Sequence, residues 1–143
     1  MKREHIFWLL HIVVPLVVGG LMYLQFRPDA YLSGLVCRGM GISAPVFTGT
    51  APAGQAVLTF LRNFLCDMLW AYALTMTVAW ILERPAAVLI ICCTMEMGIE
   101  WLQRLQILSG TFDPADIILE CITTIIALFI VNRHRQRAER RSQ

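Results

Sequence analysis

Residues 64–105 read FLCDMLWAYALTMTVAWILERPAAVLIICCTMEMGIEWLQRL, which is two apolar runs joined by the short polar turn Glu83-Arg84-Pro85. Each run, 64–82 and 86–105, has about the 20 residues that an α-helix needs to cross the roughly 30 Å hydrocarbon core of a bilayer. Because the turn is so short, the two helices must lie side by side in opposite directions. The stretch therefore predicts a hairpin of two antiparallel transmembrane helices.

The composition of the whole chain agrees with a membrane location. Of its 143 residues, 57% are hydrophobic and 15% are charged, against roughly 45–50% and about 25% in soluble domains. A chain with so few polar residues cannot surround its apolar residues with a polar surface in water, which excludes an ordinary soluble enzyme. The length suits a single domain, which we place at 1–132.

Two further apolar stretches complete the expected fold. Residues 6–26 contain no Lys, Arg, Asp or Glu, and Asp113-Pro114 has the N-cap and first-turn residue types of a helix over 115–131. Residues 27–63 are rich in turn-forming residues. We therefore expect an all-α membrane protein, a four-transmembrane-helix bundle with an extended external loop between spans one and two. A basic tail over 133–143 should fray into water.

The basic residues are distributed unequally between the two sides of such a bundle. Eight lie at the termini and the 83–85 turn, and four belong to the other side. The side of a membrane protein that is rich in Lys and Arg faces the cytoplasm, so we expect both termini to be cytoplasmic. The tail lacks the interleaved aromatic residues of a nucleic-acid site, which favours contact with anionic lipid and no nucleic-acid partner.

Acidic residues also occur inside the expected spans, where insertion of an acid costs about 2.5–3.5 kcal/mol. Polar residues on three spans follow a four-then-three spacing that places them on one helical face. The three sets are Asn63-Asp67-Trp70, Glu96-Glu100-Gln103 and Asp116-Glu120-Thr123. Since these residues lie toward the outer ends of their helices, with Glu96 deepest, we expect one shared site open to the outer leaflet.

Ordinary structural roles compete with this interpretation. Asp113 and Asp116 can cap the fourth span, and Glu100 can pair with Arg104 one turn away. We prefer the structural role for Asp113 and the functional role for Glu100, Gln103 and Asp116 together. Because Glu96 lies deepest, we expect it to be neutral and expect Glu100, closer to water, to ionise first.

The surplus of acids over nearby arginines has three explanations. The carboxyl groups can be protonated, they can bind a cation, or they can bind a ligand that carries a cation or a phosphate with its metal. The sequence does not choose among these. The cofactor is therefore unknown, and a divalent cation is one candidate.

The five cysteines are Cys37, Cys66, Cys92, Cys93 and Cys121. They form no C-x-x-C pair and no Cys/His ligand spacing, so zinc and redox motifs have no support. We interpret them as small apolar packing residues.

The polar residues resemble a known family. Glu96-x-x-x-Glu100-x-x-Gln103, a linker, and Gly110-Thr-Phe-Asp113-x-x-Asp116-Ile-Ile-x-Glu120 are similar to the VanZ-like family of small bacterial membrane proteins. Members carry a helix on which glutamate is followed by glutamine, then a loop, and then a helix that contains an Asp-x-x-Asp motif. Arg62-Asn63-Phe-Leu-x-Asp67-x-Leu-Trp70 also resembles the preceding helix of one branch. The resemblance covers roughly 60–130, and Glu120 stands where the family usually has asparagine.

The resemblance implies a protein of the bacterial plasma membrane and cell envelope, linked to low-level glycopeptide (teicoplanin) antibiotic resistance. Its substrate would be a lipid headgroup or a lipid-linked envelope precursor. Glu100, Asp116 and Asp67 would be acid/base or metal-holding groups, and Gln103 and Asn63 would orient the polar group. Arg62 or Arg104 would contact phosphate oxygens. Glu96 and Glu120 would complete the binding site.

Two other classes stay open. A non-catalytic accessory or assembly subunit would use the same acids to lock helix packing, and a small transporter or proton path is disfavoured because no internal repeat is visible. The sequence decides neither whether the chain is an enzyme nor its oligomeric state.

The distribution of basic residues makes a topological prediction. A reporter fused after Gln143 should behave as cytosolic, and a reporter inserted between residues 40 and 54 should behave as exported. Export of the C-terminal reporter would contradict the four-span arrangement.

Overall fold

The computed structural model describes residues 2–26, 39, 57, 60–108 and 112–142. The described part is all helical and contains no strand, which confirms the all-α part of the expected fold. Its elements are α1 (Lys2–Phe26), η1 (Leu61–Leu65), α4 (Cys66–Ile81), α5 (Pro85–Arg104) and α6 (Pro114–Ser142). The expected external loop lies almost entirely outside the described residues.

By length and composition, three helices in the described part of the chain are able to cross a membrane, as in a multi-pass membrane protein. The apolar segments are Glu4–Leu24, Pro85–Arg104 and Pro114–Arg140. The fourth long helix, α4, has 16 residues. The π-helical turn η1 precedes it directly, and Cys66 at the junction keeps helical dihedral angles (φ −60°, ψ −50°). Helical backbone therefore begins three residues before the expected start at residue 64.

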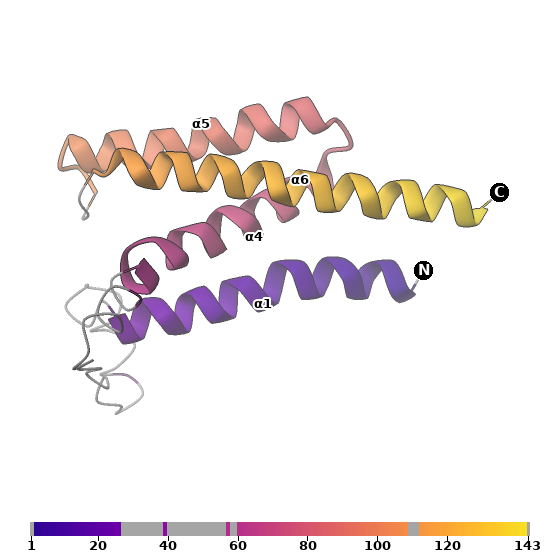
Figure 1. The fold of residues 1–143 in the computed structure, drawn as a ribbon, viewed down its shortest axis with the longest axis horizontal. Helices are drawn as coiled ribbons and strands as arrows, with labels where there is room; N and C mark the ends of the chain where they lie inside the picture. Colours follow the sequence, from indigo (N-terminus) through magenta and orange to yellow (C-terminus); the bar gives the residue numbers. More distant parts are fainter. Residues whose placement is uncertain (1, 27–38, 40–56, 58–59, 109–111, 143) are drawn as a thin grey trace.

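The helices form an antiparallel arrangement in which both termini lie at the same end (Figure 1). The turn between α4 and α5 lies toward that end, whereas α1 finishes and α4 begins at the opposite end, beside the α5–α6 connection. α4 packs against α1, α5 and α6. The two helices of the 64–105 hairpin are adjacent, as the short turn predicted.

Small side chains allow α4 to approach its neighbours closely. Ala71, Ala73 and Ala79 are all buried on this helix. On α1, a Cβ added at Gly19 would lie 3.4 Å from the Leu69 Cβ, and the Gly19 carbonyl accepts a hydrogen bond from the Cys66 thiol at 3.3 Å. Small residues at helix contacts are typical of membrane proteins, where packing and hydrogen bonds replace the hydrophobic drive between helices.

The N-terminus of α6 is capped as the sequence predicted. The Asp113 carboxylate accepts a hydrogen bond from the Ala115 backbone N–H at 2.9 Å, and Pro114 occupies the first helical position. The cap satisfies a backbone donor that has no partner within the helix. The structural role preferred for Asp113 is therefore confirmed.

The basic tail differs from the expectation. α6 continues through it to Ser142, so the expected fraying is wrong. The Arg135 guanidinium donates hydrogen bonds to the backbone carbonyls of Ala79, Leu82 (3.1 Å) and Glu83 (2.9 Å). Carbonyls at a helix C-terminus lack intrahelical partners and carry partial negative charge, so a cation there is favourable. This contact ties the start of the tail to the end of α4.

A substitution of Arg135 tests this contact. Arg135→Ala should lower the stability of the purified protein by about 1–2 kcal/mol, because several carbonyls lose a charged donor. Reversible unfolding in mixed micelles measures the difference. Arg137→Ala removes an exposed arginine two residues away on α6 and is the matched control. Equal stability of the two variants would show that the Arg135 contacts contribute nothing measurable.

Candidate functional site

Acidic side chains from three helices lie around Glu120. Glu120 on α6 lies within electrostatic range of four other carboxyl groups, those of Asp67, Glu96, Glu100 and Asp116. They come from α4, α5 and α6, as the helical spacing predicted. These residues belong to the start of α4, the second half of α5 and the start of α6. In Figure 1 these parts of the three helices lie at the end of the bundle away from the termini. We call these five residues the carboxylate cluster.

Glu100 connects α5 to the start of α6. Its side chain is only 4% exposed, and its Oε2 atom accepts a hydrogen bond from the Asp113 backbone N–H at 3.4 Å. Glu100 was expected to lie closer to water than Glu96, but the two residues are equally exposed. That expectation is wrong because it counted depth along α5 alone, whereas the N-terminus of α6 covers Glu100 from the side.

Glu96 is held by a threonine on the facing helix. Thr124 on α6 is fully buried and donates a hydrogen bond to Glu96 Oε1 at 2.9 Å. The Thr124 hydroxyl also lies 3.0 Å from the hydroxyl of Thr75 on α4, which donates to the Ala71 carbonyl. One chain of polar contacts therefore joins α5, α6 and α4. The second carboxyl oxygen of Glu96, Oε2, is buried with no hydrogen-bond partner among the described residues.

The two threonine hydroxyl groups have fewer protons to donate than there are contacts in this chain. Two threonine hydroxyls carry one proton each, yet three contacts run from Glu96 through Thr124 and Thr75 to Ala71. Because Thr124 donates to Glu96 and Thr75 donates to Ala71, the contact between the two threonine hydroxyl groups has no proton of its own.

The other cluster members are less enclosed. Asp67 and Asp116 are half-buried, and so is Glu120, although its Oε2 atom is buried without a hydrogen-bond partner among the described residues. A buried carboxyl oxygen without a donor is costly in an apolar environment. Such an atom is positioned to accept from a ligand or to coordinate a cation.

The predicted binding residues lie at the edge of this cluster or outside the described side chains. Gln103 is half-buried near the end of α5, and Arg104 is exposed. The Arg104 guanidinium lies over the rings of Trp101 (5.7 Å) and Phe112 (5.1 Å). Arg62 and Asn63 belong to η1, and their side chains lie outside the described part of the structure, so their roles stay predictions.

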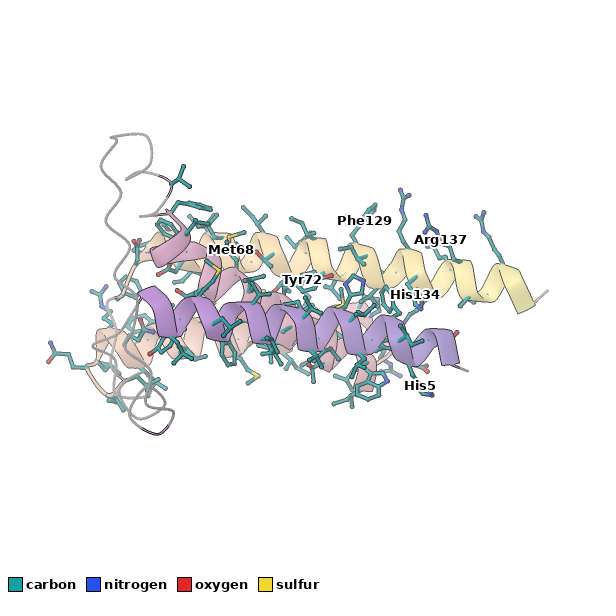
Figure 2. All side chains as sticks on the ribbon, turned by 90° about the horizontal axis from the view of Figure 1, so that it is seen from below. His5, Met68, Tyr72, Phe129, His134 and Arg137 are labelled. Atoms are coloured by element: carbon teal, nitrogen blue, oxygen red, sulfur yellow. The ribbon has the colours of Figure 1, made fainter. Side chains whose placement is uncertain are left out.

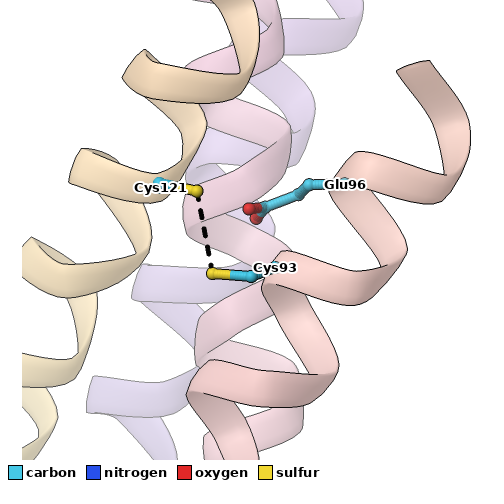
Figure 3. Close-up of side chains that lie close together, drawn as sticks. All are labelled: Cys93, Glu96 and Cys121. Atoms are coloured by element: carbon cyan, nitrogen blue, oxygen red, sulfur yellow. Dashed lines mark hydrogen bonds between the residues drawn. The ribbon is translucent and has the colours of Figure 1, made fainter. Parts of the chain in front are cut away.

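Sequence reasoning missed a group of possible metal ligands. Cys93 and Glu96 on α5 and Cys121 on α6 each place a donor atom within 4.8 Å of the others (Figure 3). The cysteines were interpreted as packing residues because no paired motif was present. The available signal was the three-residue spacing of Cys93 and Glu96, which places them on one face of α5. The contribution of Cys121 depends on how α6 is aligned against α5.

A second polar group lies nearer the termini. The Tyr72 hydroxyl on α4 is hydrogen-bonded to His11 on α1, and the Phe7 ring stacks on His134 of α6 at 3.7 Å between centroids. In Figure 2, His134 lies between α1 and α6, whereas Phe129 and Arg137 project away from α1. These contacts attach α1 to the bundle and are separate from the carboxylate cluster.

No protein-family model, curated protein or solved structure matches this chain. The resemblance to the VanZ-like family therefore stays a prediction that rests on the polar residues named above.

The buried hydroxyl contacts make a stability prediction. Thr124→Val should destabilise the protein by about 0.5–2 kcal/mol, since it removes two hydrogen bonds between helices. Thr123→Val is a close control, because among the described residues the Thr123 hydroxyl donates to the Leu119 carbonyl within its own helix, α6.

A double-mutant cycle isolates the contact. In a Glu96→Met background, Thr124→Val should cost clearly less than in the wild type, because the acceptor is already gone. Unfolding in mixed micelles measures all four proteins. Additive effects would show that Thr124 and Glu96 are not coupled.

Proposed function

We propose that this chain is a VanZ-like protein of the bacterial cell envelope that acts on a lipid headgroup or a lipid-linked precursor at the outer leaflet of the plasma membrane. The convergence of five carboxyl groups from three helices carries this proposal. Acids inside a membrane are costly, so they are generally retained for a substrate, an ion or a proton.

The proposal includes four membrane spans with both termini in the cytoplasm. η1 and α4 form one continuous helical run from residue 61 to residue 81, which is about 30 Å long at 1.5 Å per residue. That length matches the hydrocarbon core of a bilayer. The arrangement then places the termini and the arginine-rich tail on one side, as the excess of basic residues there requires.

With this orientation, the carboxylate cluster lies toward the outer leaflet. The exposed Trp101 and the half-buried Phe112 mark the same end of the bundle, and aromatic side chains favour the membrane–water interface. Arg104 lies over both rings, where an exposed guanidinium is able to bind the phosphate of a headgroup. Anionic and cationic groups thus lie within one short stretch of the surface.

The carboxyl groups divide into two kinds by their contacts. Glu100 and Asp113 hold the α5–α6 connection, so we assign Glu100 a positioning role. Asp116, Glu120 and Asp67 are only partly buried and are the better candidates for contact with substrate. A carboxylate among other carboxylates is suited to general acid/base work or to holding a divalent cation against phosphate.

A non-catalytic accessory subunit is the second candidate. The contact between Glu100 and the Asp113 N–H, and that between Thr124 and Glu96, favour it because both acids bind other parts of the chain. In that case the carboxylate cluster would stabilise helix packing and bind no substrate.

Complementation of a deletion strain separates the two candidates. Wild-type protein, Asp116→Asn and Asp113→Asn are expressed at matched levels, and headgroup lipids, lipid-linked envelope precursors and teicoplanin susceptibility are measured. Asp113→Asn should restore the wild-type state, because asparagine also caps helices. Asp116→Asn should reach the same membrane abundance and fail to restore it.

The opposite result would favour the accessory role. If Asp116→Asn restores every phenotype at normal abundance, the acid is not needed for chemistry or binding. If Asp116→Asn and Glu120→Gln fail to restore the wild-type state only to the extent that their membrane abundance is reduced, the contribution of these two acids is structural.

A further inference from the structure

We propose that Cys93, Cys121 and Glu96 form a binding site for a thiophilic divalent cation, with Zn²⁺ as the expected ion. The two thiols and the carboxyl group come from α5 and α6, and their donor atoms lie within 4.8 Å of one another. This proposal rests on the geometry of these two helices and is independent of the function proposed above.

The distance between the sulfur atoms suits a tetrahedral ion. The Cys121 and Cys93 Sγ atoms are 3.7 Å apart. Two sulfurs at about 2.3 Å from Zn²⁺ in tetrahedral geometry are separated by about 3.8 Å. A disulfide would need the same atoms at about 2.05 Å. The two sulfur atoms therefore lie at a separation that a shared tetrahedral ion allows and are not joined by a disulfide bond.

The third ligand is oriented by its neighbour. Glu96 is 4% exposed, and Thr124 holds its Oε1 atom, while Oε2 is buried with no hydrogen-bond partner among the described residues. Figure 3 shows the Glu96 carboxyl group and the two thiols directed toward a common space between α5 and α6. A hydrogen bond to a ligating carboxylate that fixes its direction is a recurrent feature of metal sites.

The charge and chemistry of the donors favour zinc over a hard cation. Two thiolates with one carboxylate select thiophilic ions, whereas Mg²⁺ and Ca²⁺ prefer oxygen ligands alone. Three protein ligands also leave a fourth position for water, as in catalytic zinc sites.

Metal binding to the purified full-length protein tests the proposal. The detergent-solubilised chain, stripped of metal and kept reduced, is dialysed against Zn²⁺ alone, and bound zinc is measured by elemental analysis. We expect one Zn²⁺ per chain. Replacement with Co²⁺ or Cd²⁺ should produce a thiolate-to-metal charge-transfer absorption.

Variants assign the ligands. Cys93→Ser and Cys121→Ser should each lower Zn²⁺ affinity at least tenfold and weaken the thiolate absorption. Glu96→Gln should lower affinity about tenfold while keeping that absorption. Cys92→Ala changes the adjacent buried cysteine, which is not part of the site, and should bind Zn²⁺ like the wild type. Unchanged affinity in a Cys93→Ser/Cys121→Ser double variant would overturn the proposal.

A measurement on the unmodified chain covers the case in which a variant does not fold. Zn²⁺ should slow alkylation of Cys93 and Cys121 by N-ethylmaleimide at least tenfold, with the labelled positions read by mass spectrometry. Equal alkylation rates with and without Zn²⁺ at these two cysteines would overturn the proposal. If the chain binds Zn²⁺ but Asp116→Asn still restores the envelope phenotype, the metal site is supported and the proposed function is contradicted.

Discussion

The chain of polar contacts through Thr75, Thr124 and Glu96 is the interaction on which the rest of the bundle depends. It joins α4, α6 and α5 in a region otherwise filled by Met76, Val88 and other apolar side chains. Within a bilayer no water replaces a lost hydrogen bond, so each of these groups requires a partner from the protein. The helices must therefore keep one rotational setting relative to one another. That setting brings Asp67, Asp116 and Glu120 around the same space, because each acid lies on the same face of its helix as a residue that packs inward.

The ends of the bundle are held by different chemistry. At the end with the termini, the Arg135 guanidinium contacts carbonyls at the end of α4, and Phe7 stacks on His134. At the opposite end, Glu100 accepts the Asp113 backbone N–H. Both ends use a charged side chain to satisfy backbone groups that helix termini leave without partners. The bundle is consequently held at both ends, with α6 fixed to the end of α4 at one and α5 fixed to the start of α6 at the other.

Much of this arrangement follows from local sequence. The apolar lengths of 86–105 and 115–131 and the Asp113-Pro114 cap predict helices at the observed places, and the four-then-three spacing places the acids on one face of each helix. Local sequence does not specify the contacts between helices. The burial of Glu100 depends on where α6 begins to cover it, the helical tail depends on carbonyls of α4 that Arg135 reaches, and the Cys93–Cys121 pair depends on the alignment of two helices. Each of these features is a tertiary contact between residues at least 13 positions apart.

The first helix differs from the others in a way that bears on the site. Between Ile6 and Leu24, α1 carries no Lys, Arg, Asp or Glu, and residues such as Leu9, Val13 and Leu21 on it are exposed. Its polar attachments to the bundle include the hydrogen bonds of His11 with Tyr72 and of the Gly19 carbonyl with the Cys66 thiol. The carboxylate cluster and the three proposed metal ligands are all supplied by α4, α5 and α6. The five acids of the carboxylate cluster therefore all lie between residues 60 and 130, and the described contacts of α1 with this unit are packing contacts and the two hydrogen bonds above.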